Sequence, residues 1–256
     1  MTSKIKTFQD PSEILWDESF KEQIAQDSYN TAPVECIVRS VSHFLRARFK
    51  SPEKFKNLKF LEVGCGAGAN LIWLAEKGIL PSGVDISKTA LSLCRKNFQK
   101  KFLYNKLGDL KHSPATALPF DAATFDGIIE SCVFQHLNQD DRTKAHKEVV
   151  RVMKPGGVFI GHMLSVNHST YKTNRGYFEE IEPGTLVLES KIVSGKINLE
   201  SIGLSHFFSK SEYHTLLEGC SIIDPCEITY QLPSEEAARR GYKSYCQAMW
   251  NVYAVK

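Results

Sequence analysis

Short apolar runs and amphipathic segments alternate along the chain from the stretch LEVGCGAGAN, at 61–70, to about residue 162. The apolar start of that stretch reads as a strand, three glycines follow it, and a helix is expected over 69–77 with its leucines on one side. A second strand leads into GVDIS. Ser87 is then a good N-cap for a helix in which apolar residues recur at helical spacing up to Phe98.

The same alternation continues through the next sixty residues. It predicts strands over 102–107 and 124–131, a helix over about 140–153, and a strand at VFIGH, 158–162. Such a pattern is typical of a parallel, doubly wound sheet, whose strands all end at one edge. We therefore expect four polar residues that follow or end predicted strands to meet there: Asp85, Asp109, Ser131 and His162.

The rhythm breaks at 163–208, which shows no clear helical period and contains a possible hairpin over 185–199. A long connection of this apolar composition is usually functional, so we expect a substrate cap. Ser209 and Glu212 then predict a capped helix up to Gly219, followed by two closing strands. The expected organisation is a helical N-terminal extension or lid (1–58), a cofactor-binding core (59–162), the cap insertion (163–208), and a C-terminal helix and strands that complete the core (209–256).

Composition narrows the class of protein. The 256 residues carry a net charge of +3, which indicates neither nucleic acid nor an acidic membrane as a partner. No stretch approaches the ~20 apolar residues of a membrane span, and the N-terminus lacks the apolar centre of a signal peptide. Seven cysteines without metal-ligand spacing favour reduced thiols and no metal site. A cytoplasmic protein is expected; its oligomeric state cannot be derived from the sequence.

The glycine run by itself is compatible with two cofactors. Gly64-x-Gly66-x-x-Ala69, with Asp85 downstream, satisfies the dinucleotide fingerprint, so NAD is one interpretation. Taken instead as Glu62-x-Gly64-x-Gly66-x-Gly68, the same letters place an acid two residues before the first glycine.

Four linked segments favour the second interpretation: LEVGCGAGAN, GVDIS, ALPFDAATFDGIIESCVFQHL and RVMKPGGVFIGH. In order and spacing they resemble the class I S-adenosylmethionine-dependent methyltransferases, particularly their type 11 branch. The resemblance implies S-adenosylmethionine as cofactor. It also implies a Rossmann-like α/β/α sandwich around a seven-stranded, mostly parallel sheet with a reversed last strand.

The resemblance also assigns roles to residues. The loop with Glu62, Gly64, Cys65, Gly66 and Gly68 would lie along the methionine part of the donor, with its backbone amides available to the ligand. Asp85 would bind the ribose and Ile86 would flank the adenine; Ser131 and Cys132 would offer carbonyls to the donor ammonium. Asp109 and Leu110 resemble the adenine-binding pair, although LKHSPATA separates Asp109 from Leu118 where the branch has a shorter spacing, so Ala115 is an alternative adenine contact.

Methyl transfer needs a positioned acceptor and, for a hydroxyl or ammonium acceptor, a base. His162 is our candidate base, while His136 and His206 are further candidates, and a structural or donor-side role is the alternative for His136. Tyr29 and Trp16 are candidates for a lid over the donor.

The sequence therefore predicts an enzyme that transfers a methyl group from S-adenosylmethionine to oxygen or nitrogen of a small-molecule acceptor. An NAD-dependent oxidoreductase and a non-catalytic S-adenosylmethionine-binding protein are the alternatives.

Overall fold

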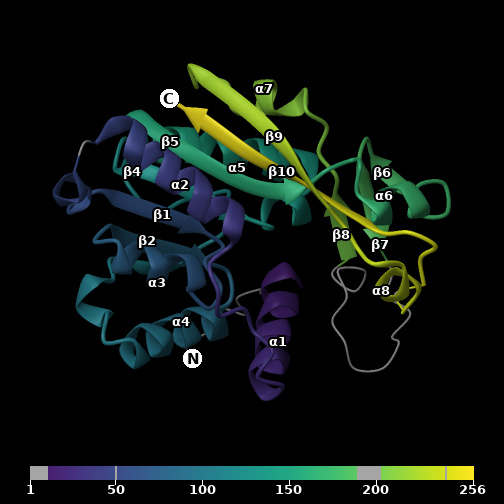
Figure 1. Ribbon diagram of the computed structural model, residues 1–256, viewed down its shortest axis with the longest axis horizontal. Helices are drawn as coiled ribbons and strands as arrows, with labels where there is room; N and C mark the ends of the chain where they lie inside the picture. The colour runs from purple at the N-terminus through teal and green to yellow at the C-terminus, as the bar shows by residue number, and fades with distance from the viewer. Residues whose placement is uncertain (1–10, 50, 189–202, 240) are drawn as a thin grey trace, which may run out of the picture.

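One seven-stranded sheet organises the computed structural model, which describes residues 11–49, 51–188, 203–239 and 241–256 (Figure 1). The strand order is β3-β2-β1-β4-β5-β10-β9. β3, β2, β1, β4 and β5 are parallel, and β10 runs antiparallel to both of its neighbours. The strands are β1 (Lys59–Val63), β2 (Leu80–Asp85), β3 (Leu110–His112), β4 (Phe125–Ser131), β5 (Met153–Leu164), β9 (Ile222–Gln231) and β10 (Cys246–Val255). The predicted fold class and the reversed last strand are confirmed.

Helices cover both faces of this sheet because the central strands are apolar on both sides. α2 (Glu35–Arg48), α3 (Ala69–Glu76) and α4 (Lys88–Lys100) bury apolar residues in one cluster with Phe60 and Ile160. α5 (Gln139–Val152) and α7 (Glu212–Leu216) pack in a second cluster with Phe159 and Trp250. Short 3-10 turns occur at η1 (Pro52–Phe55), η2 (Tyr104–Lys106) and η3 (Phe134–His136).

The third strand is not where the apolar pattern placed it. The prediction of a strand over 102–107 is wrong: this stretch includes the η2 turn, and β3 begins at Leu110. β3 has only three residues and pairs with β2 alone, so it lies at the edge of the sheet and carries little periodicity. This shift of the strand moves Asp109 to its N-terminal end.

The segment after β5 forms a separate small sheet beside the C-terminal ends of the strands (Figure 1). It contains α6 (Ser169–Asn174), β6 (Glu180–Glu182), β7 (Thr185–Leu188) and β8 (Gly203–His206), in the order β6-β7-β8. β7 pairs with β8, and the greater part of the hairpin predicted over 185–199 lies outside the described residues. α8 (Ser234–Arg239) connects β9 to β10.

The helix predicted from Ser209 to Gly219 is shorter than expected, since α7 spans only five residues. The prediction that Ser209 caps it is wrong, because the N-cap is Ser211 and makes no side-chain capping hydrogen bond. The contact between Glu212 and Ser209 is present: Glu212 accepts hydrogen bonds from the Ser209 N–H (2.6 Å) and hydroxyl (2.7 Å).

The N-terminal region divides into two unlike helices. α2 is packed into the core, whereas every residue of α1 (Pro11–Ala25) is exposed or half-buried, and α1 stands beside the C-terminal edge of the sheet (Figure 1). In the described part of the chain, none of the helices combines the length and apolarity needed to cross a membrane.

Candidate functional site

The glycine loop between β1 and α3 forms the floor of the candidate site. Gly64 has φ +69°, and a Cβ there would lie 2.2 Å from Val133 Cγ2, so both the backbone conformation and the close approach of Val133 require glycine. Loop amides are already used inside the protein: Gly64 and Cys65 donate to the Val84 carbonyl, and Gly68 donates to that of Cys65. The loop therefore offers a close-fitting backbone surface rather than a row of free N–H donors, which differs from the sequence-based expectation.

Asp85 holds the loop against the end of β2. Its Oδ2 accepts from the Gly66 N–H and its Oδ1 from the Ser87 N–H, each at 2.8 Å. Burial raises the pKa of this carboxyl, while the two backbone donors act in the opposite direction. A carboxylate has about four acceptor positions, so each oxygen retains capacity for a ligand hydroxyl.

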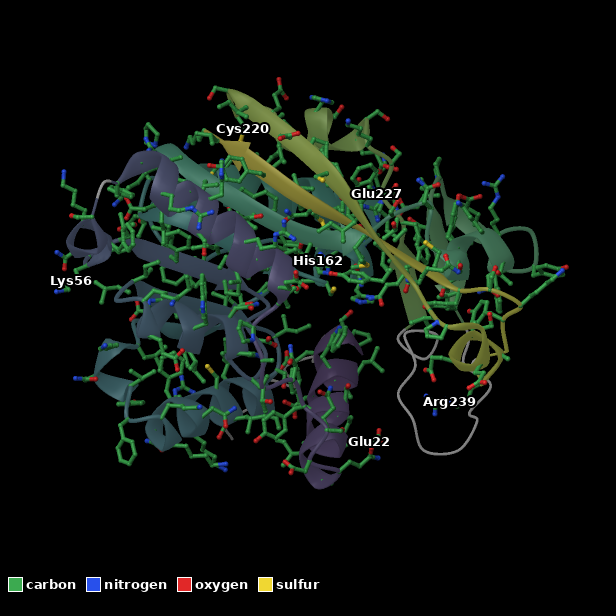
Figure 2. The ribbon with its side chains drawn as sticks, viewed as in Figure 1. Glu22, Lys56, His162, Cys220, Glu227 and Arg239 are labelled. Atoms are coloured by element: carbon green, nitrogen blue, oxygen red, sulfur yellow. The ribbon has the colours of Figure 1, made fainter. Side chains whose placement is uncertain are left out.

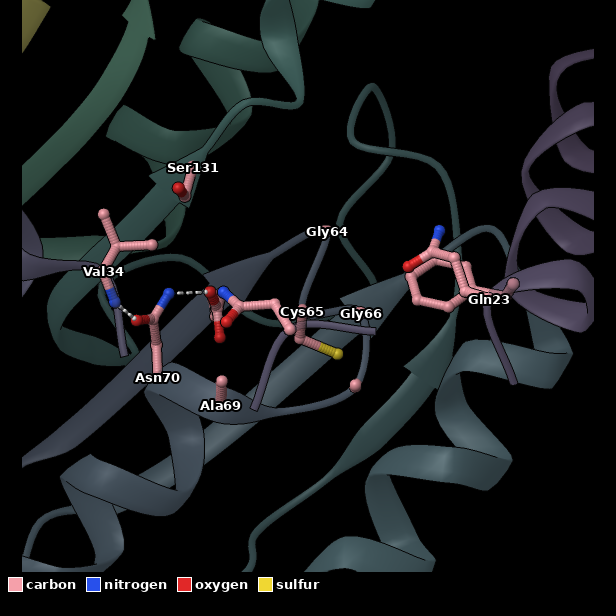
Figure 3. Close-up of a pocket in the computed structure, with 12 residues that line it drawn as sticks. Gln23, Val34, Gly64, Cys65, Gly66, Ala69, Asn70 and Ser131 are labelled. Atoms are coloured by element: carbon pink, nitrogen blue, oxygen red, sulfur yellow. Dashed lines mark hydrogen bonds between the residues drawn. The ribbon is translucent and has the colours of Figure 1, made fainter. Parts of the chain in front are cut away.

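A pocket of about 150 Å³ lies over this floor. Its lining combines the glycine loop and the adjoining parts of β1 and α3 with α1, the α1–α2 connection and the end of β4: Phe20, Gln23, Asn30, Val34, Glu62, Gly64, Cys65, Gly66, Ala67, Ala69, Asn70 and Ser131 (Figure 3). A chain of hydrogen bonds crosses the pocket wall, from the Val34 N–H to Asn70 Oδ1 (2.8 Å) and from Asn70 Nδ2 to Glu62 Oε1 (2.7 Å) (Figure 3).

Glu62 is the most unusual group in the pocket. Its side chain is buried, and its Oε2 has no hydrogen-bond partner among the described residues. Burial raises the pKa of Glu62 to about 8; the Asn70 hydrogen bond opposes this, and the nearby carboxylates Asp85 and Glu130 add to it. Glu130, also fully buried, has its pKa raised by burial to about 7. A cationic ligand group would stabilise the ionised form of Glu62.

The structure places Asp109 away from this pocket, so its expected position at the C-terminal edge of the sheet is wrong. Asp109 precedes β3, its carbonyl accepts from Gly83 N–H, and its exposed carboxylate pairs with Lys111 (3.5 Å). Leu110 pairs with Gly83, which lies two residues before Asp85 on β2. Of the segment LKHSPATA noted in the sequence, Leu110–His112 form β3 itself and residues 113–117 follow it.

The last residue of β3 and the residues after it lie where Asp109 was expected, at the C-terminal end of β2. His112 is the register partner of Asp85, and the Ser113 N–H donates to the Asp85 carbonyl (3.2 Å). His112 Nε2 lies 2.9 Å from the carbonyl oxygen of Ile86, the residue expected beside adenine. Ala115, the alternative contact, is buried just beyond these residues.

Ser131 and His162 lie together, as expected. They are register partners on β4 and β5, so their side chains project from the same face of the sheet, and Ser131 lines the pocket. Burial lowers the pKa of His162 to about 4, and its Nδ1 has no partner in the described structure. Cys132 follows at φ +60° and donates its N–H to the His162 carbonyl (2.9 Å).

The other two candidate histidines are held by the protein itself. His136 Nδ1 lies 3.1 Å from the Leu204 carbonyl oxygen of the cap, and burial lowers its pKa to about 4. His206 is fully buried between Thr185 (2.6 Å) and Glu212 (2.9 Å). Both arrangements favour structural roles.

The two lid candidates, Trp16 and Tyr29, lie at different places in the structure. Trp16 packs edge-on against His136, with 5.2 Å between ring centroids. Tyr29 lines a different hollow, between the end of α1 and α4. Sequence reasoning missed Asp17, Phe20 and Gln23, although their helical spacing with Trp16 was a signal for one inward face of a helix.

Comparison with known proteins identifies the core. A family model described as a methyltransferase domain matches residues 61–161. A protein of Haemophilus influenzae is 32% identical over 120 residues, which cover 45% of this chain and 47% of that protein. The ubiquinone biosynthesis O-methyltransferase of Dinoroseobacter shibae is 26% identical over 170 residues, 66% of each chain. The chain thus spans about half to two thirds of the length of these relatives.

A solved structure shows the same fold. The S-adenosylmethionine-dependent methyltransferase of Methanosarcina mazei aligns with a TM-score of 0.60 and 20% identity, covering 80% of this chain and 97% of that one. The matching domain contains the glycine loop and Ser131, which line the pocket, and Asp85, which accepts a hydrogen bond from the loop residue Gly66. Residues 61–161 therefore match a methyltransferase domain, and the chain has the fold of the S-adenosylmethionine-dependent methyltransferases.

Proposed function

We propose that this protein transfers the methyl group of S-adenosylmethionine to an oxygen or nitrogen of a small-molecule acceptor. The observation that carries the proposal is the carboxyl of Glu62, which lines a pocket against the glycine loop and whose buried Oε2 has no partner among the described residues. An acid in that position fits the ammonium group of the donor. When bound, the donor supplies an electrophilic methyl group on a sulfonium.

Other residues of the chain would bind the donor and accept the proton of the acceptor. Asp85 would accept from the two ribose hydroxyls, since a carboxylate can accept both. Ser131 and Cys132 would contribute carbonyl oxygens near the ammonium. His162, neutral at pH 7 because burial lowers its pKa to about 4, would accept the acceptor's proton through its free Nδ1.

Two observations bear on the acceptor: one on its size and one on the atom that is methylated. The cap packs its own apolar cluster beside the site, with Leu186 and Phe207 at its centre, as expected for a wall against a small ligand. One relative carries the name ubiquinone biosynthesis O-methyltransferase, which favours an oxygen acceptor.

All seven cysteines are free thiols, which favours a reducing compartment such as the cytoplasm.

The experiment combines binding and transfer. Thermal shift with S-adenosylmethionine, S-adenosylhomocysteine and NAD measures which ligand stabilises the protein. Incubation with methyl-labelled donor and a metabolite extract, followed by mass spectrometry, then identifies the labelled acceptor. Stabilisation by NAD alone would support the oxidoreductase alternative, and donor binding without any labelled product would support the non-catalytic one. The same incubation with His162→Ala tests the base.

A further inference from the structure

The inner face of α1 lies along the donor site. Six residues of this helix are half-buried, and the others are exposed. Apart from Ser19, the half-buried residues recur at helical spacing and form one face: Glu13, Trp16, Asp17, Phe20 and Gln23. The C-terminal half of this face lines the pocket, through Phe20 and Gln23. The N-terminal half reaches α4 and His112, where Glu13 lies 3.8 Å from Lys88 Nζ and 3.3 Å from His112 Nε2.

Asp17 joins α1 to the first turn of α4. Its Oδ1 accepts from the Ser87 hydroxyl (2.8 Å) and from the Thr89 N–H (2.9 Å). A carboxylate at a helix N-terminus is stabilised by the helix dipole and by the unpaired N–H groups there. Partial burial acts to raise the pKa of Asp17, but the hydrogen bonds from Thr89 and Ser87 outweigh it and lower that pKa to about 2. Asp17 is therefore ionised at neutral pH.

The contact is close to the donor-binding residues. Ser87, which donates to Asp17 through its hydroxyl, donates its own N–H to Asp85 Oδ1. On the other side of Asp85, the Phe20 ring lies against the glycine loop, where a Cβ on Gly66 would be 3.2 Å from it. α1 therefore contacts both residues that donate to the Asp85 carboxylate: Asp17 contacts Ser87, and Phe20 contacts Gly66.

The C-terminal end of α1 does not pack closely against α4. A hollow of about 400 Å³ separates its C-terminal end from α4, lined by Ile24, Tyr29, Leu93 and Lys96 among others. The pocket beneath α1 has a volume of about 150 Å³, less than the roughly 300 Å³ at the lower end of small-molecule sites. We infer that α1 moves when a donor enters, and the movement is made easier because no residue of α1 is fully buried.

We propose that α1 is a lid over the donor site and that Asp17 is the positioning residue that latches it shut against α4. This inference rests on the proposed function, because the donor is the molecule that the closed lid would retain. With the latch formed, Phe20 closes the glycine-loop end of the site and Trp16 meets His136 on the acceptor side. With the latch broken, both aromatic contacts are released together.

The latch can be tested in the ligand-free protein. We expect Asp17→Ala to increase amide hydrogen exchange in α1 by about tenfold, the effect of losing charge-assisted hydrogen bonds at a helix N-terminus. Asp17→Asn, which keeps an acceptor oxygen, should restore part of the protection. Glu22→Ala is the matched control, because Glu22 is an exposed acid of the same helix outside the inner face (Figure 2). Exchange in the sheet and in α4 beyond its first turn should be unchanged in all three variants.

Donor retention is measured with S-adenosylhomocysteine as the probe. Asp17→Ala should raise its dissociation rate by about tenfold in stopped flow, since most affinity changes appear in that rate. Trp16 fluorescence, obtained as the difference from Trp16→Phe, should report loss of the His136 contact. Exchange and dissociation rates in Asp17→Ala equal to those of Glu22→Ala would overturn the latch. Failure of the wild-type protein to bind the probe would instead overturn the proposed function, and the lid's role with it.

Discussion

A single buried carboxyl, that of Glu62, sets the charge of the pocket. At neutral pH it is largely protonated in the free protein, because burial raises its pKa to about 8. A donor ammonium beside Oε2 would favour the ionised form, so binding should release about one proton at pH 7. Donor affinity should then increase by up to about tenfold per pH unit between pH 6 and pH 8.

Calorimetry with S-adenosylhomocysteine, in buffers of different ionisation enthalpy, measures this proton release. Glu62→Gln is the matched control, since the amide preserves shape and cannot release the proton. Binding without proton release in the wild-type protein would contradict the assigned partner of Glu62.

Two aspartates make a paired test of the corrected site. Asp85→Ala should weaken S-adenosylhomocysteine binding about 100-fold, because hydrogen bonds to charged groups contribute about 1.5–3 kcal/mol each. Asp109→Ala should leave affinity unchanged, since Asp109 is exposed at the opposite end of β3. Calorimetry on both variants, with circular dichroism to verify folding, checks the assignment. A loss of affinity in Asp109→Ala would restore the adenine role suggested by the sequence resemblance.

At the scale of elements, one buried ion pair joins the cap to the core. Arg142 of α5 is 3% exposed; its guanidinium donates to Glu182 Oε1 of β6 (3.1 Å) and to the Leu137 carbonyl (2.6 Å). Glu182 Oε2 also accepts from the Gln139 N–H at the start of α5. The pair therefore fixes the position of the cap relative to the core.

Removing one partner leaves a buried charge unpaired, which typically costs 3–5 kcal/mol. Glu182→Ala should therefore lower the free energy of unfolding by about 3 kcal/mol, measured by urea denaturation. Glu179→Ala, at an exposed position nearby in the chain, should change it by less than about 0.5 kcal/mol. Equal stability of the two variants would show that the pair does not hold the cap.

At the scale of the whole molecule, burial of histidines couples stability to pH. Burial lowers the pKa to about 4 for His136, His146, His162 and His168. The unfolded chain binds more protons at these sites below pH ~6.5, so their contribution to stability is complete above that pH and is lost as pH falls toward 4.

Two buried acids act in the opposite direction. Glu62 and Glu130, with pKa values raised to about 8 and 7, are protonated in the folded protein, so their contribution is complete below pH ~4.5 and is lost as pH rises to 8. Between pH 4.5 and 6.5, the four histidines change the free energy of unfolding with pH more than the two acids do, so stability rises with pH. Above pH 6.5 only the acids still change it, so stability falls. The ligand-free protein should be most stable near pH 6.5 and lose at most about 3 kcal/mol per pH unit on the acidic side. Urea denaturation from pH 5 to 8.5 measures this; greatest stability at pH 5 would contradict it.

Much of the fold followed from local patterns in the sequence. The glycine run and Asp85 were predicted at their observed places because the turn requires residues without Cβ and because a strong strand, β2, precedes the acid. β3 was misplaced because three residues at a sheet edge carry little periodicity, and Asp109 was misplaced with it. The sequence resemblance alone could not correct this error, since its spacing departed from the family pattern at this point.

By itself, the sequence determined the glycine loop and most of the alternation of strands and helices, because these depend on residues that are neighbours in the chain. The reversed last strand and the class of cofactor came from the resemblance to the methyltransferase family. Only the tertiary structure decided which distant groups meet: Asp17 with the start of α4, Trp16 with His136, and Glu62 with Asn70. The physical reason is that burial, which sets the pKa of Glu62 and the seating of α1, depends on every element packed around a residue.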